Sequence, residues 1–257
     1  MILTVDIGNS NIVAGGMDPQ KTYFVERLSA NLYMTSLEYA VSFKNILEMN
    51  RIDAGAISGC IICSVVPPLT NTIREALERV THHLPLVVGP GIKTGLNIKM
   101  DNPAQLGSDL VVDAVAAIHE YGAPLLIFDM GTATTMSAVD KSGSYVGGAI
   151  IPGLKVSLDS LSSRASQLPR IGLDSPKRII GTNTIECMKS GAIFGNACMI
   201  DGMIDRAQEE LKGPVKVIST GGLARFITPC CRHTIIYDDI LLLKGLLLLY
   251  LKNRPGN

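Results

Sequence analysis

A short pattern that occurs twice, half a chain apart, constrains this sequence more than any other feature. The first copy is Leu3-Thr-Val-Asp6-Ile-Gly8-Asn-Ser-Asn11, and the second is Leu126-Ile-Phe-Asp129-Met-Gly131-Thr-Ala-Thr134. In each copy an apolar strand runs into Asp-x-Gly and a few small hydroxyl or amide residues, and apolar alternation then resumes. The pattern predicts a strand–turn–strand hairpin in each half, and therefore a duplicated fold.

The turn of such a hairpin is suited to binding phosphate. Glycine lets backbone N–H groups approach an anion closely, and Ser, Thr and Asn side chains add donors. The carboxylate at the strand end can hold a cation directly or through water. Asp-x-Gly alone is also ordinary turn chemistry, so the inference depends on the two matching copies. We expect a cleft between two phosphate-facing hairpins.

Composition excludes several classes of partner. The 257 residues include 23 basic and 23 acidic side chains, with a sequence pI near 6.9, so we expect neither a nucleic-acid nor a membrane partner. The N-terminus lacks the basic and apolar regions of a signal peptide, which favours a cytoplasmic protein. The longest apolar run, residues 241–251, falls short of the roughly 20 residues of a membrane span and predicts a buried helix.

The cysteines give little sign of a metal or redox site. Cys60-Ile-Ile-Cys63 has the spacing of a metal-binding pair, but it lies in a predicted strand and no second pair follows at zinc-site spacing. Cys230 and Cys231 are merely adjacent. We expect buried, reduced thiols.

Hydrophobic periodicity predicts an α/β organisation in both halves. The first half has predicted strands at 2–7, 11–16, 22–28, 57–66 and 84–88 and helices at 36–50, 69–81 and 104–121. The second has predicted strands at 125–129, 134–139, 144–150 and 215–219 and helices from about 153, at 183–211 and at 239–252. Interior glycines predict a break of helix 183–211 near Gly195 or Gly202. The predicted domains are 1–121 and 122–257.

Further motifs follow in a recognisable order. They are Ser64-Val-Val-Pro67, Gly107-Ser-Asp109, Gly147-Gly-Ala-Ile-Ile-Pro-Gly153 and Thr220-Gly-Gly222. With the two Asp-x-Gly turns, this ordered set resembles the type III pantothenate kinases, in the superfamily of acetate and sugar kinases, heat-shock chaperones and actin. The resemblance extends from residue 2 to about residue 250.

The resemblance implies duplicated ribonuclease H-like (actin-like ATPase) domains, with mixed sheets flanked by helices. It also implies ATP-dependent phosphorylation of pantothenate to 4′-phosphopantothenate, the first step of coenzyme A biosynthesis. A cytoplasmic homodimer would use Mg²⁺ and a monovalent cation, K⁺ or NH₄⁺. Helix 183–211 is the expected dimer interface because it carries small residues that allow close helix packing, namely Gly191, Ala192, Gly195, Ala197 and Gly202.

On the nucleotide side, the resemblance makes Asp6 the Mg²⁺ ligand and Asp129 the monovalent-cation ligand. The ATP-binding positions are Asp6, Ile7, Gly8, Asn9, Ser10, Asn11, Ile12, Val13 and Thr132. The alternative for both hairpins is a strand-ending turn without a ligand. Thr220-Gly-Gly222 is either the turn that admits the adenine end of the nucleotide or a structural turn.

On the acceptor side, the resemblance makes Asp109 the general base and assigns acceptor contacts to Gly107, Ser108, Asp109 and Thr184. Asp109 lies in the first turns of helix 104–121, where the helix dipole is expected to hold its pKa down. It could instead be a solvated residue of a helix N-terminus. Thr184 either reaches pantothenate from the partner subunit or belongs to a helix N-cap.

Two acceptor-side positions depart from the family pattern. Leu110 stands where the family has an arginine that grips the pantothenate carboxylate, and Met100 stands where a tyrosine is common. Leucine replaces none of a charge-assisted, often bidentate contact. Three functions therefore stay open: a pantothenate kinase, a same-fold kinase for another small alcohol, and a non-catalytic ATP-binding regulator. Asp109 favours the two enzymes, because a pure binder needs no base.

Overall fold

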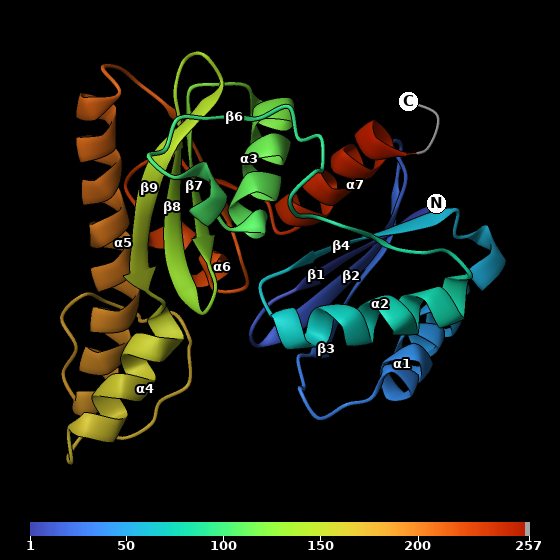
Figure 1. The fold of residues 1–257 in the computed structure, drawn as a ribbon. Helices are drawn as coiled ribbons and strands as arrows, with labels where there is room; N and C mark the ends of the chain where they lie inside the picture. The colour runs from blue at the N-terminus through green and yellow to red at the C-terminus, as the bar shows by residue number, and fades with distance from the viewer. Residues whose placement is uncertain (255–257) are drawn as a thin grey trace. The chain divides into compact units, whose positions relative to one another are not determined.

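The computed structural model describes residues 1–254, and the chain divides into two compact units (Figure 1). The first unit is built from Met1–Gly95, Ala104–Ala116 and the C-terminal segment that begins at Leu241. The second unit comprises Leu96–Pro103 and Ala117–Ile240. Residues 255–257, the end of the predicted second domain, lie outside the described residues.

The first unit is a mixed five-stranded sheet with the order β3-β2-β1-β4-β5. Strand β1 pairs antiparallel with β2 and parallel with β4. The strands are β1 (Ile2–Ile7), β2 (Asn11–Met17), β3 (Thr22–Ser29), β4 (Gly59–Ser64) and β5 (Leu86–Val87).

Helices cover both faces of this sheet. Side chains alternate along β1, so Leu3, Val5 and Ile7 enter a core with α1 (Ser36–Met49) and α2 (Pro67–Thr81). Figure 1 shows these two helices side by side. The opposite face meets α7 (Leu241–Asn253), and a Cβ added to Gly15 would lie 2.9 Å from Leu243 Cδ1 and 3.0 Å from Thr4 Oγ1.

Helix α3 (Ser108–Tyr121) gives its first part to the first unit and its last five residues, 117–121, to the second. In the first unit it packs closely on α7, because a Cβ at Gly245 would meet the Val112 carbonyl oxygen. Helix α2 begins where Ser64 Oγ accepts hydrogen bonds from Val66 N (3.1 Å) and Thr70 Oγ1 (2.8 Å). The Ser64-Val-Val-Pro67 motif therefore forms the junction of β4 and α2.

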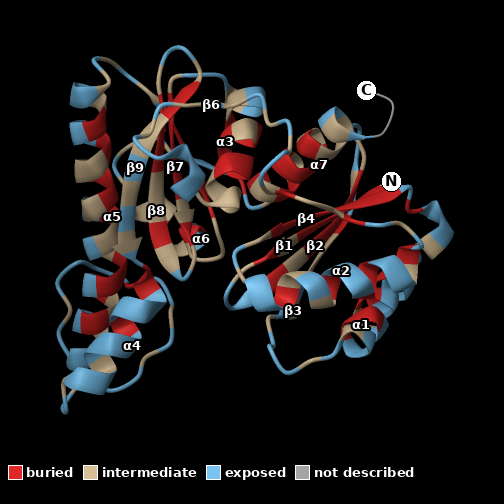
Figure 2. Ribbon diagram, viewed as in Figure 1, coloured by how far each residue is buried: buried red, intermediate tan, exposed pale blue. Residues whose placement is uncertain are grey.

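The second unit repeats this architecture. Its six-stranded sheet has the order β11-β10-β7-β8-β9-β6. The strands are β6 (Asn97–Ile98), β7 (Leu125–Met130), β8 (Ala133–Val139), β9 (Ser144–Pro152), β10 (Lys216–Thr220) and β11 (Ile236–Tyr237). Its helices are α4 (Leu154–Arg164), α5 (Thr184–Glu210) and α6 (Ala224–Ile227), and they pack with β7 and β10 in one core. Figure 2 shows the buried residues concentrated on the strands and on the inner faces of the helices.

The duplication predicted from the repeated pattern is confirmed by the strand orders. The order β3-β2-β1-β4-β5 matches β9-β8-β7-β10-β11, with β6 added at one edge. The two predicted hairpins are β1–β2 and β7–β8, both antiparallel. Asp6 and Asp129 each occupy the second-to-last position of the first strand of their hairpin.

Several details differ from the sequence-based expectation. Helix α5 is continuous through Gly195 and Gly202, because its apolar face is buried along its length and outweighs their low helix propensity. The predicted helix 104–121 starts at Ser108, after a short 3₁₀ turn at Pro103–Gln105. Helix α7 lies in the first unit, whereas the predicted division assigned it to the second domain. In residues 1–254 no helix is both long and apolar enough to cross a membrane.

Candidate functional site

The first hairpin turn places a carboxylate beside an exposed loop. Asp6 is half-buried at the end of β1, and its strand neighbour in register on β4 is Cys63. The turn is closed by a hydrogen bond from Gly8 N to Asn11 O (3.0 Å). Asn9, Ser10 and Asn11 are exposed, whereas the flanking Ile7 and Ile12 are buried in the core and Val13 is half-buried. The exposed turn and the carboxylate therefore form the polar end of an apolar hairpin.

Asp109 lies at the start of α3 in the same unit. The first backbone hydrogen bond of the helix runs from Val111 N to Gly107 O (3.2 Å), and Asp109 Oδ1 accepts a hydrogen bond from Leu110 N (2.9 Å). A Cβ on residue 107 would meet Asp109 Oδ1. Glycine at position 107 therefore makes room for the carboxylate to fold back over the helix start.

The pKa of Asp109 is raised, which makes the expectation of a depressed value wrong. Burial is the largest cause, and the backbone N–H groups of Leu110 and of Asp109 itself oppose it. Desolvation disfavours the charged carboxylate more than the helix-end donors stabilise it. A carboxyl group with a raised pKa is a better proton acceptor than an ordinary aspartate at neutral pH.

The two departures from the family pattern are both half-buried. Leu110 follows Asp109 in the first turn of α3, and its Cγ lies 3.9 Å from the position of a Cβ built on Gly107. Met100 belongs to the second unit, in the connection between β6 and the 3₁₀ turn at Pro103–Gln105.

The second hairpin has the same strand-end carboxylate, and here a glycine turn packs against it. Asp129 is in register with Thr220, the last residue of β10. The following Gly221 has a φ of +87°, and a Cβ there would meet Asp129 Oδ1. The turn is tied down by a hydrogen bond from Leu223 N to Met130 O (3.1 Å). Thr220-Gly-Gly222 therefore forms one wall around the Asp129 carboxylate.

A second glycine brings the β9–α4 junction onto the same hairpin. Gly153 N donates to Thr132 O (3.2 Å), and Gly131 N donates to Ala133 O (2.9 Å). A Cβ on Gly153 would lie 2.6 Å from Gly131 O. Carbonyl oxygens thus lie close to the glycine at the start of α4, and the Thr132 side chain is exposed beside them.

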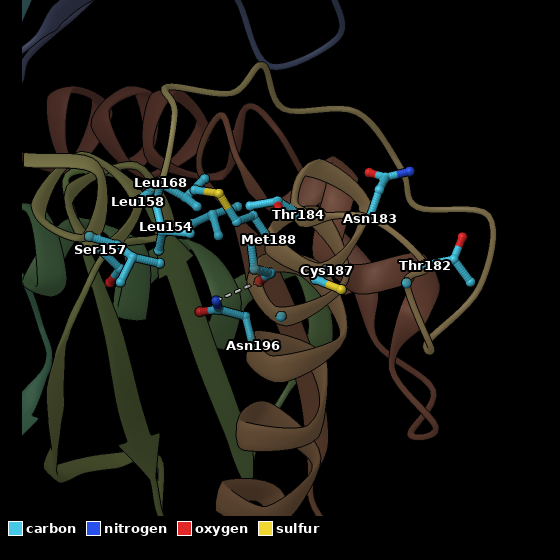
Figure 3. A pocket seen from close by; sticks show the side chains of 14 residues that line it. Leu154, Ser157, Leu158, Leu168, Thr182, Asn183, Thr184, Cys187, Met188 and Asn196 are labelled. Atoms are coloured by element: carbon cyan, nitrogen blue, oxygen red, sulfur yellow. Dashed lines mark hydrogen bonds between the residues drawn. The ribbon is translucent and has the colours of Figure 1, made fainter. Parts of the chain in front are cut away.

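Thr184 lies on an apolar groove of the second unit with a volume of about 780 Å³ (Figure 3). It is the first residue of α5, and the N-cap is Asn183, whose Oδ1 accepts from Glu186 N (3.0 Å). The groove lies between α4, α5 and the segment that precedes α5, and its apolar lining includes Leu154, Leu158, Leu161, Leu168 and Met188.

Helix α5 divides its small residues between two faces. Ala192 and Ala197 pack into the core of the second unit, and Ala192 also lines the groove. Gly191 and Gly195 are exposed, with nothing within 4 Å of a built Cβ. Cys187 and Cys198 are exposed on the same helix, which corrects the expectation that all the thiols are buried.

The sequence alone gave no role in this site to two polar residues near Asp109. Cys63, considered from the sequence only as a possible metal ligand, is buried next to Asp6 on the neighbouring strand. Asp113 is 1% exposed, one helical turn beyond Asp109. A charged residue at a helical spacing from a candidate base, within an apolar stretch, is the signal that could have identified it. Among the described residues, no group of three or more His, Cys, Asp or Glu side chains is arranged to hold a metal ion.

Comparisons with known proteins agree with this architecture. The family model described as type III pantothenate kinase matches residues 2–206. A type III pantothenate kinase of Halalkalibacterium halodurans is 41% identical over 253 residues, which cover 98% of this chain and 100% of that protein.

Two solved structures show the fold. A Campylobacter jejuni protein, described as a candidate Baf family transcriptional activator, is 20% identical with a TM-score of 0.59 over 98% of each chain. Component A of the Acidaminococcus fermentans (R)-2-hydroxyglutaryl-CoA dehydratase is 15% identical with a TM-score of 0.55, covering 97% of this chain and 96% of that one. The fold is the duplicated ribonuclease H-like, or actin-like ATPase, fold.

Proposed function

This chain belongs to the type III pantothenate kinase family, and from that premise we propose that it transfers the γ-phosphoryl group of ATP to the hydroxyl group of pantothenate. The product is 4′-phosphopantothenate, and the reaction is the first step of coenzyme A biosynthesis. The observation that carries the proposal is the 41% identity to a type III pantothenate kinase over nearly the whole length of both chains.

The nucleotide phosphates bind the two hairpin turns in this proposal. Asp6 and the exposed turn of Asn9, Ser10 and Asn11 supply a carboxylate and polar side chains at one place in the first unit. Thr132 supplies a hydroxyl group at the matching turn of the second. Phosphoryl transfer depends mainly on holding the phosphates and neutralising their charge, and these residue types suit that task.

The residues fit both proposed cations. Mg²⁺ in kinases is usually held by one or two carboxylates together with water and substrate phosphates, so Asp6 alone meets the need for a protein ligand. Asp129 offers a carboxylate to K⁺ or NH₄⁺ at the end of β7, and the carbonyl oxygens of Gly131 and Thr132 lie close to Gly153 in the turn that follows. When bound, the cations would neutralise charge on the phosphates. The close packing of Gly221 on Asp129 fixes the carboxylate that would serve this site.

Asp109 accepts the proton of the acceptor hydroxyl group. Its raised pKa and half-buried position at a helix start suit a base that must take up a proton. The transition state of phosphoryl transfer is loose, so the proton leaves the acceptor late. Asp109 therefore also orients the hydroxyl group for in-line attack.

Leu110 favours a second candidate function, phosphorylation of a small alcohol that has no carboxylate. The side chain is half-buried, apolar and adjacent to the base, so it offers no charge to an anionic acceptor. Retention of Asp109 counts against a third function, that of a non-catalytic ATP-binding regulator. An acceptor panel distinguishes these functions directly.

The test is a product assay with ATP, Mg²⁺ and K⁺, in which mass spectrometry identifies the phosphorylated acceptor and ADP release is counted. Acceptors are pantothenate, its alcohol analogue with a hydroxymethyl group in place of the carboxylate, and a panel of small alcohols. We expect acceptor-dependent ADP release with pantothenate. Turnover of the alcohols alone supports the second function, and acceptor-independent or absent ADP release refutes the kinase assignment.

We further propose a homodimer in which α5 takes part and Thr184 serves the partner's acceptor site. Support comes from the exposed Gly191 and Gly195 and from exposed apolar side chains around the groove, among them Leu161, Ile180 and Ile185. Exposed apolar side chains beside an apolar groove are common where proteins contact one another.

A further inference from the structure

The face of the first sheet that carries Asp6 also carries a buried thiol. In the parallel pair of β1 and β4, Asp6 is in register with Cys63, so both side chains leave the sheet on the same side. Val5 and Ile62, one position earlier, point to the opposite face and join the core with α1 and α2. Cys63 is 0% exposed.

This thiol is linked to the start of α3 by a chain of two hydrogen bonds. Cys63 Sγ donates to Ser108 Oγ (3.4 Å), and Ser108 Oγ donates to Ser64 O (3.3 Å). Ser108 is the first residue of α3, and Asp109 is the second. The end of β4 therefore contacts the helix at the residue directly before the candidate base.

The surroundings keep the thiol protonated, and only a protonated thiol can donate. Burial is the largest cause that raises the pKa of Cys63, and the negative charges of Asp6, Asp109 and Asp113 add to it. The hydrogen bond with Ser108 opposes them. These carboxylates surround Cys63 from β1 and from α3.

We propose that Cys63 and Ser108 are positioning residues, which fix the first turn of α3 to the end of β4 and so orient the Asp109 carboxylate relative to Asp6. This inference rests on the proposed kinase function, in which Asp109 contacts the acceptor and Asp6 serves the nucleotide side. It gives Ser108 a role different from the substrate contact expected from the sequence.

The second unit uses the corresponding place in its own sheet for a similar purpose. Thr220 on β10 is in register with Asp129, as Cys63 on β4 is with Asp6. The residue after Thr220, Gly221, packs on the Asp129 carboxylate. In both units the strand beside the carboxylate strand therefore contributes to the arrangement of the site.

Steady-state kinetics of single variants tests the proposal. Ser108→Ala removes both hydrogen bonds, whereas Cys63→Ala removes only the one that the thiol donates and leaves Ser108 Oγ bonded to Ser64 O. We expect kcat to fall by about three- to tenfold in Ser108→Ala and by a smaller factor in Cys63→Ala, with KM for ATP within about twofold of wild type in both. Cys63→Ser keeps a donor at the same place and should restore most of kcat. The matched control is Cys60→Ala, because Cys60 is also buried on β4 and contacts Thr81 Oγ1 (3.3 Å) on the other face.

A double-mutant cycle separates one shared link from two independent effects. Because both residues act through the same link, the Cys63→Ala/Ser108→Ala variant should be about as slow as the slower single variant. Losses in kcat that multiply overturn the proposal, as does a Cys63→Ala variant no slower than Cys60→Ala.

A readout without catalysis keeps the inference testable if no acceptor is phosphorylated. Amide hydrogen exchange of a peptide covering residues 105–116 should be faster in Cys63→Ala and Ser108→Ala than in wild type, and unchanged in Cys60→Ala. Unchanged exchange in both link variants refutes the anchoring itself. Faster exchange without any product in wild type refutes only the kinase function.

Discussion

The substitution Leu110→Arg tests whether the acceptor site of this chain has lost an anchor for a carboxylate. Leu110 is half-buried in the first turn of α3, next to Asp109. An arginine there would present a planar fork of donors to an acceptor carboxylate and would touch no phosphate. We predict that the variant has a lower KM for pantothenate and an almost unchanged KM for ATP.

The expected size follows from the chemistry of the contact. A hydrogen bond to a charged group contributes about 1.5–3 kcal/mol, and about 1.4 kcal/mol corresponds to a factor of ten, so KM should fall roughly ten- to hundredfold. The substitution should also lower the stability of the folded protein. A cation in the first turn of a helix opposes the helix dipole by about 0.3–1 kcal/mol, which lowers Tm by roughly 1–4 °C in a chain of this size.

The assay compares two acceptors that differ at one group, a carboxylate in pantothenate and an uncharged hydroxymethyl group in the analogue. Initial rates with pantothenate and with its hydroxymethyl analogue are measured for wild type, Leu110→Arg and Leu110→Gln. The glutamine variant matches the polarity and much of the length without the charge. The gain should appear for pantothenate alone and in the arginine variant alone, and calorimetric Kd values separate binding from chemistry.

An equal gain for both acceptors refutes the reasoning, since the analogue has no carboxylate to pair with the arginine. So does a pantothenate KM unchanged in Leu110→Arg while Tm and KM for ATP stay near wild type. In that case the acceptor carboxylate binds elsewhere or the natural acceptor has none.

Three further predictions concern the base, the cation site and the interface. Asp109→Asn should lower kcat by about 10²–10⁴ and leave ATP binding intact. The folded-state pKa of Asp109 is raised, so the wild-type protein loses stability as the pH rises from the unfolded-state pKa to the folded-state pKa. Differential scanning calorimetry at pH 7 should therefore give a higher Tm for Asp109→Asn than for wild type. Well below both pKa values this difference in Tm should disappear. Gly221→Ala should lower Tm and weaken activation by K⁺ more than Gly143→Ala does. The two glycines share a positive φ (+87° at Gly221 and +76° at Gly143), but a Cβ on Gly143 would enter open space. Equal effects of the two substitutions would mean that the contact with Asp129 is unimportant. Gly195→Glu should lower the mass measured by light scattering from that of a dimer to that of a monomer. Gly172→Glu, whose side chain would also enter open space, should leave the dimer intact. A wild-type protein that is monomeric at micromolar concentration would contradict the proposed dimer.

The fold was predictable because its strongest signal is local and occurs twice. Apolar alternation on either side of Asp6 and of Asp129 indicates two hairpins, and two similar halves imply two similar sheets. Helix α5 shows the limit of local propensity, since burial of its apolar face keeps it intact through two glycines. The predicted break weighed each glycine without the tertiary packing that compensates for it.

The candidate site was predictable only where a residue type is informative by itself. Asp109 could be identified from its motif, but its pKa depends on burial that no local pattern reports. Cys63 was recognised as part of the site only because it is in register with Asp6 on another strand. Ser108 was recognised as a positioning residue only because it accepts a hydrogen bond from Cys63. Such pairings join residues far apart in the chain, so single-sequence periodicity does not contain them.

The return of α7 to the first unit has a consequence for biosynthesis. The N-terminal unit lacks a layer until the last helix is made, because Leu243 and Gly245 pack on its sheet and on α3. Residues 117–240 of the second unit, by contrast, are contiguous and emerge from the ribosome earlier. The N-terminal unit can therefore be completed only after residues 117–240 have been synthesised, in contrast to the usual vectorial order in which the N-terminal domain is finished first. A polypeptide that ends before residue 241 would have an N-terminal unit in which one face of the sheet lacks the cover of α7.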